Sequence, residues 1–114
     1  MIITIPFPPS ILRPNDKSCW QAKNPVKVAY REKCKSIALE NIPNFKEGNI
    51  EIKLTFYPPN NRWDYDAMLS AFKSGQDGVC LAWGINDKRL RPVLIDPRDA
   101  DKKNPRVEIT ITKQ

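Results

Sequence analysis

Hydrophobic and polar positions alternate in four parts of the chain, and this alternation predicts four strands. Residues 1–7 alternate and are rich in isoleucine, and prolines follow them closely. Residues 49–57 alternate again, with isoleucine, leucine and phenylalanine at every second position. Two shorter stretches near the end of the chain, residues 90–95 and 106–112, predict two more strands.

Helical spacing predicts two helices between these strands. The first is expected to begin at Asn24, a capping residue, with Pro25 at the first helical position, and to end by Pro43. This places residues 10–23 in a long polar loop. Apolar positions of the first helix recur at the spacing of a core-facing stripe: Val26, Tyr30, Cys34, Ile37 and Ala38.

The second helix is expected to run from about residue 66 to residue 82. Trp83 follows its apolar face and is expected in the core or in a dimer interface. Gly78 favours a break or distortion of this helix, and Asp77 beside it is expected to be structural, with a role as a further site residue as the alternative. Trp63, just before the helix, is expected to pack under the preceding loop, with stacking on a DNA base as the alternative.

The order strand, helix, strand, helix, strand, strand predicts an α/β (α+β) fold with two helices packed on a mixed four-stranded sheet. A length of 114 residues favours one domain covering residues 1–114. No run of 18 apolar residues occurs, so we expect no membrane span. The first ten residues lack the basic and long apolar regions of a signal peptide, which favours a cytoplasmic protein.

Charge and cysteine content narrow the expected chemistry. The formal net charge is +6, which fits a polyanionic partner such as nucleic acid. The chain has no histidine, so a general base would have to be a carboxylate, a lysine or a metal-bound water. Cys19, Cys34 and Cys80 are odd in number and widely spaced, which predicts buried or half-buried free thiols rather than disulfides or a zinc site.

Acidic residues gather around the second helix of this basic chain. Asp64 and Asp66 point the same way only if the backbone between them is extended, and Asp66 is also a plausible helix cap. On the helix itself, positions 66, 70, 73 and 77 share one polar face. The ordinary interpretation of such a face is a hydrated helix surface.

These carboxylates would repel a phosphodiester substrate unless a cation lay between them. Mg²⁺ prefers oxygen ligands from a few carboxylates and binds phosphate on its free side, where it can activate water and neutralise charge. Asp64, Asp66 and Asp87 are the candidate Mg²⁺ ligands. Lys73 is the candidate catalytic cation that would stabilise charge in the transition state.

Several motifs occur together in a characteristic order: "PFPPS" after the first strand, then "DYD", "KSGQDG", "WGINDKRLRP" and a final "VEITI". In this order they resemble the RusA family of Holliday junction resolvases, which is common in phages and prophages. The resemblance implies a homodimeric, Mg²⁺-dependent endodeoxyribonuclease that resolves four-way junctions in DNA recombination and repair, within a bacterial host cell. It assigns catalytic roles to Asp64, Asp66, Lys73 and Asp87.

The chain departs from the family pattern at two positions. Ala67 stands where the family often has asparagine. In one branch of the family the catalytic lysine lies four residues after the second aspartate, where this chain has Ser70, and in another it lies seven after, which matches Lys73. These departures keep open a non-catalytic DNA-binding relative of the nucleases. A protein-interaction module, with the acids as caps and hydrated surface, is a third interpretation.

Basic residues that could contact DNA phosphates form three groups. The group nearest the proposed site contains Arg62, Lys88, Arg89 and Arg91. The first helix adds Lys27, Arg31 and Lys35, for which a hydrated helix face is the simpler interpretation. The N-terminal loop adds Arg13, Lys17 and Lys23.

Overall fold

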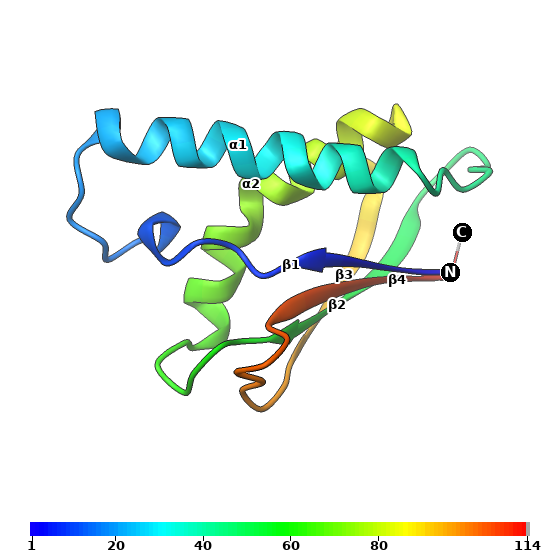
Figure 1. Ribbon diagram of the computed structural model, residues 1–114. Helices are drawn as coiled ribbons and strands as arrows, with labels where there is room; N and C mark the ends of the chain where they lie inside the picture. The colour runs from blue at the N-terminus through cyan, green and yellow to red at the C-terminus, as the bar shows by residue number, and fades with distance from the viewer. Residues whose placement is uncertain (114) are drawn as a thin grey trace.

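The structure is a computed structural model that describes residues 1–113, and its architecture matches the predicted fold class. Four strands and two long helices form one α+β unit (Figure 1). Their bounds are β1 (Ile2–Pro6), α1 (Trp20–Leu39), β2 (Ile50–Tyr57), α2 (Tyr65–Trp83), β3 (Leu90–Pro97) and β4 (Arg106–Lys113). Two short 3₁₀ turns, η1 (Ser10–Leu12) and η2 (Asp87–Arg89), precede α1 and β3.

The sheet is mixed, with the strand order β1-β4-β2-β3. The β2–β3 pair is parallel, whereas β4 runs antiparallel to both of its neighbours. Buried side chains alternate along β1, β2 and β4, so one face of the sheet is covered. Both helices lie on the same side of the sheet (Figure 1), and the rings of Phe56 on β2 and Phe72 on α2 meet edge to face at 5.7 Å.

The start of α1 differs from the sequence-based prediction. The helix begins at Trp20 rather than after Asn24, and Pro25 lies inside it. The amides of Ala22 and Lys23 already bond to the Cys19 carbonyl, so a first turn forms before the proline. Pro25 removes one amide donor, and because Gln21 is exposed, water can solvate the carbonyl that this donor would have reached. The predicted loop is therefore shorter and contains η1.

Two glycines let α2 approach α1 closely. A Cβ atom at Gly78 would lie 2.2 Å from the Arg31 carbonyl oxygen, and one at Gly75 would lie 2.7 Å from the Tyr30 ring. The expected break at Gly78 is wrong, because α2 continues without interruption to Trp83. The missing side chain serves helix packing rather than a change of backbone direction.

Tryptophans fix both ends of α2. The Trp83 ring is buried, and its Nε1 donates to the carbonyls of Ala38 and Asn41, which confirms a core position. Trp63 is also buried and packs edge to face on Phe7 at 4.8 Å, so the packing interpretation is confirmed. Arg13 lies over the Trp63 ring at 3.9 Å and thereby attaches the N-terminal loop to the start of α2.

Two further expectations concern the cysteines and the hydropathy of the helices. Cys34 and Cys80 are buried free thiols as predicted, whereas Cys19 is free but exposed, so the expectation of burial is wrong for Cys19. Within residues 1–113, neither helix combines the length and the hydropathy that crossing a bilayer requires.

Candidate functional site

The first two predicted site residues lie at the N-terminus of α2, and both are exposed. Asp64 is the N-cap: its backbone is extended, and its Oδ1 accepts a hydrogen bond from the Ala67 amide at 2.8 Å. Asp66 lies in the first helical turn, where a carboxylate interacts favourably with the positive end of the helix dipole. The expectation that Asp66 is the cap is therefore wrong, because the helix begins one residue earlier at Tyr65.

The other two predicted residues form an ion pair further along α2. Lys73 Nζ lies 3.8 Å from Asp87 Oδ2, and the two side chains are 62% and 45% exposed. Asp87 begins η2, a turn that is capped by Asn86, whose Oδ1 accepts from the Lys88 amide. Lys73 follows Asp66 by seven residues, which corresponds to roughly 10 Å of helical rise.

The three predicted metal ligands are not gathered in this structure. Among residues 1–113, no group of three or more histidine, cysteine, aspartate or glutamate side chains is close enough to hold one ion. Asp64 and Asp66 lie at the start of α2, whereas Asp87 lies beside Lys73. As they stand here, the three residues do not fit a shared Mg²⁺ ion, and the metal site remains a prediction.

Asp87 also borders a hollow of about 340 Å³ between α1 and the end of α2. Arg31, Asp77 and Cys80 line the same hollow, so Asp77 shares surroundings with Asp87. Burial raises the pKa of the Cys80 thiol to about 11, and the negative charges of Asp87 and Asp77 act in the same direction. The sequence analysis favoured a structural role for Asp77, but this residue lines the same hollow as Asp87 of the predicted catalytic set.

A basic groove of about 300 Å³ separates the N-terminal half of α1 from the middle of α2. We call it the lysine groove, and its polar and aromatic lining consists mainly of Trp20, Lys23, Lys27, Ser70, Lys73 and Ser74. No acidic side chain is among the residues that line it. Sequence reasoning named Lys23, Lys27 and Lys73 but placed Lys23 in a loop and missed Trp20, because it put the first helical position at Pro25 instead of Trp20. It also missed Ser74 on α2, because the burial of that side chain depends on how the two helices pack.

The remaining predicted DNA contacts are spread over the surface. Arg62, Lys88 and Arg91 are exposed, as phosphate contacts would require. Arg89 instead donates to the carbonyls of Lys46 and Gly48, so it holds the loop before β2. Arg31 and Lys35 are half-buried on α1. Arg62 also lines a polar hollow of about 540 Å³ together with Arg13 and Lys17 of the N-terminal loop.

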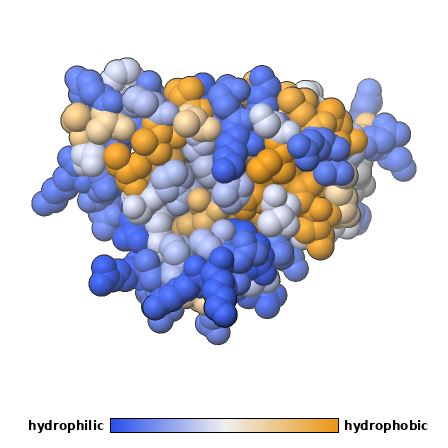
Figure 2. Space-filling model, viewed as in Figure 1, coloured by the Kyte–Doolittle hydropathy of each residue, from blue (hydrophilic) through white to orange (hydrophobic). Residues whose placement is uncertain are grey.

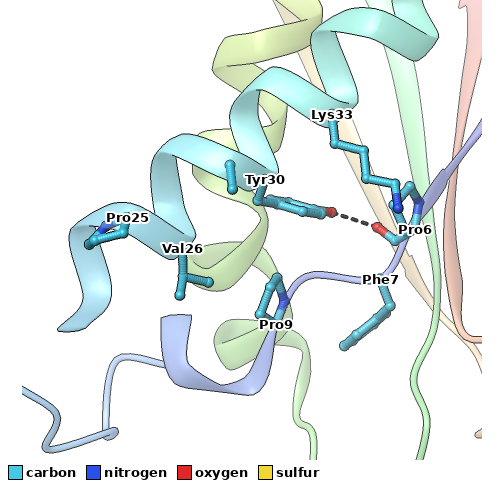
Figure 3. A pocket seen from close by; sticks show the side chains of 8 residues that line it. Pro6, Phe7, Pro9, Pro25, Val26, Tyr30 and Lys33 are labelled. Carbon is cyan, nitrogen blue, oxygen red and sulfur yellow. Dashed lines mark hydrogen bonds between the residues drawn. The ribbon is translucent and has the colours of Figure 1, made fainter.

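An apolar hollow of about 480 Å³ lies between α1 and the segment after β1 (Figure 3). Tyr30 closes its floor, where the phenolic hydroxyl donates to the Pro6 carbonyl at 2.7 Å. Figure 2 shows hydrophobic surface in separate areas of this face, with hydrophilic side chains between them. None of the predicted catalytic residues lines this hollow, so it is separate from the predicted catalytic site.

Comparison with known proteins identified a relative of this chain. No family model matches the chain. The chain is 30% identical, over 119 aligned positions, to a protein of Xylella fastidiosa (strain Temecula1) described as an uncharacterized protein. The alignment covers 96% of this chain and 74% of the Xylella protein.

Proposed function

We propose that this chain, which belongs to the same family as the Xylella fastidiosa protein, is a DNA endonuclease that acts on branched DNA such as four-way junctions. The supporting observation is the position of Lys73, which lines the lysine groove and pairs with Asp87. One side chain thereby connects a basic surface suited to a DNA backbone with a carboxylate of the predicted catalytic set. The assignment of nuclease activity rests on the resemblance to the RusA resolvases.

Phosphate binding is the step that the groove supports most directly. Lys23, Lys27 and Lys73 present positive charge from two helices, and such contacts bind the DNA backbone without reading its sequence. An exposed ion pair contributes roughly 0.2–1 kcal/mol, so a DNA phosphate can take Lys73 away from Asp87. The lysine would then neutralise a phosphate while the Asp87 carboxylate becomes free beside it.

Mg²⁺ is part of this proposal as the ion that resolvases of this type use. It commonly binds proteins through one or two carboxylates and completes its shell with water and substrate phosphates. Because Asp64, Asp66 and Asp87 do not lie together among the described residues, no catalytic step is assigned to the ion here. A homodimer would offer two equivalent sites to a junction that is itself nearly two-fold symmetric.

A second candidate is a DNA-binding relative that does not cleave. The specific observation in its favour is the separation of the three carboxylates, together with the use of an Asp64 oxygen as a helix cap. This candidate shares the lysine groove with the first. The two therefore differ in cleavage and not in DNA binding.

The test is a cleavage assay on a synthetic four-way junction, with and without Mg²⁺, using wild type and Asp66→Asn. We expect Mg²⁺-dependent cleavage by wild type and a loss of roughly 100-fold or more in the variant, the size typical of losing a group that acts in catalysis. Asp99→Asn is the matched control, because it removes an exposed carboxylate in the β3–β4 loop. Gel-shift measurements establish that each variant still binds the junction.

The possible failures separate the hypotheses. Wild-type protein that binds junctions but leaves junctions, flaps and duplexes uncut in Mg²⁺ would support the non-catalytic candidate. A protein with no DNA affinity at low salt would overturn both and favour a protein-interaction module.

A further inference from the structure

Trp20 occupies an unusual position at the rim of the lysine groove. It is the first residue of α1, and 71% of its surface is exposed. A tryptophan is large and mostly apolar, so a folded chain gains nothing from leaving it in water. Its placement beside Lys23 and Lys27 suggests that an external group covers it.

The groove presents two facing rows of side chains. Trp20, Lys23 and Lys27 lie three and four residues apart, so they share one face of α1. On α2, Lys73 and Ser74 follow Ser70 by three and four residues, so these side chains also share one helix face and line the opposite wall. A ligand between the rows would meet an aromatic ring, ammonium groups and hydroxyl groups.

Ser74 gives independent evidence that the groove receives a polar ligand. The residue is only 3% exposed, and its Oγ is buried without a hydrogen-bond partner among the described residues. Buried hydroxyl groups are normally paired, and each exception needs a reason. Because Ser74 lines the groove, a bound anion could accept the hydrogen bond that Oγ has available.

The N-terminus of α1 adds to this electrostatic environment. Its N-cap residue, Cys19, makes no side-chain capping bond, and its first turn contains no acidic residue. The positive end of the helix dipole is therefore not compensated by a carboxylate within α1. Free amides at such an end favour a negatively charged group nearby.

We propose that the lysine groove binds an unpaired nucleotide of single-stranded DNA, with its base stacked on Trp20 and its phosphate held by Ser74, Lys23 and Lys27. Aromatic platforms beside basic grooves are the general means by which proteins hold single strands. A base inside a duplex has its faces covered by its neighbours, so stacking on Trp20 requires an unpaired base. This inference rests on the proposed DNA function and specifies which part of a branched substrate the groove takes.

The experiment measures binding of oligo(dT) and of a duplex of equal length, in EDTA so that no cleavage occurs. Trp20→Ala should weaken oligo(dT) binding by roughly 5- to 100-fold, the range for losing one stacked base, with little change for the duplex. Trp20→Phe should retain most of the affinity because it keeps an aromatic face. Leu39→Ala is the matched control, since it removes an exposed apolar side chain at the other end of the same helix.

A second readout uses the wild-type protein alone. Trp63 and Trp83 are buried while Trp20 is exposed, so a soluble quencher should act mainly on the fluorescence of Trp20. Bound oligo(dT) should quench this same fluorescence.

Ser74→Ala should weaken oligo(dT) binding without lowering stability, because its Oγ makes no hydrogen bond in the folded chain.

Equal oligo(dT) affinity of wild type and Trp20→Ala, or unquenched Trp20 in the saturated complex, would overturn this inference even if junction cleavage is observed. Trp20-dependent binding of single strands by a protein that cleaves no junction would support it and reject the nuclease proposal. The two proposals therefore fail separately.

Discussion

At the scale of single residues, Asp64 has a structural role that must be separated from any catalytic one. Its Oδ1 accepts from the Ala67 amide at the start of α2. We expect Asp64→Ala to lower the free energy of unfolding by about 1 kcal/mol, the usual cost of losing an N-cap. Asp64→Asn should leave stability nearly unchanged, because asparagine caps helices as well as aspartate. Urea unfolding of the three proteins measures both effects.

This pair of variants also informs the proposed chemistry. If Asp64 acts only as a cap, Asp64→Asn will behave as wild type in the cleavage assay. If its charge is needed, the variant will be stable and inactive. An Asp64→Asn protein as unstable as Asp64→Ala would contradict the capping role.

At the scale of elements, the contact between α1 and α2 depends on Gly78. In an open helix, Gly→Ala would stabilise by up to about 1 kcal/mol. Here the new Cβ would lie 2.2 Å from the Arg31 carbonyl oxygen, a backbone atom that cannot move by itself. We expect Gly78→Ala to destabilise the protein by roughly 1–3 kcal/mol, as overpacking usually does. Thermal and urea unfolding provide the measurement.

Ser36→Ala is the comparison for this element, because Ser36 is an exposed residue of α1. Its effect should stay within about 0.5 kcal/mol, as is usual at exposed surface positions. A Gly78→Ala variant as stable as wild type would mean that the two helices do not approach as closely as described.

The elements also show where sequence patterns are informative. All four strands and α2 follow from period-two and helical spacing to within about two residues, because their apolar faces are regular. The start of α1 was missed because Asn24-Pro25 matches a capping signal, while the actual first turn has an exposed tryptophan and no capping side chain. Gly78 was misread because only the partner helix reveals why a side chain is excluded there.

At the scale of the whole molecule, the site depends on contacts between distant parts of the sequence. The sequence analysis assigned Lys73 and Asp87 to one predicted catalytic set, and the two side chains form an ion pair. It could not identify the lysine groove, since Trp20 and Ser74 meet only when α1 packs on α2. Nor could the spacing of acidic residues show that Asp66 lies in the first turn of α2 while Asp87 lies in η2, beside Lys73.

The net charge of +6 and the lysine groove together predict how DNA binding responds to salt. Each phosphate neutralised contributes a slope of about −0.7 for single strands to the dependence of log K on log salt concentration. Lys27 is exposed and lies in the groove, so Lys27→Ala should make the slope for oligo(dT) shallower by about that amount. Lys113→Ala, at the end of β4 and not among the residues that line the groove, should leave the slope unchanged. Binding titrations between low and moderate salt give the slopes directly.

Both variants remove one positive charge, so the net charge falls equally in each. A slope that changes by the same amount in both would mean that DNA responds to the overall charge of the molecule, and no particular surface would then be the binding site. A change confined to Lys27→Ala would place a phosphate between the two helices, next to the Lys73–Asp87 pair. The local geometry of the groove, rather than the basic composition of the chain, would then determine where the DNA backbone lies.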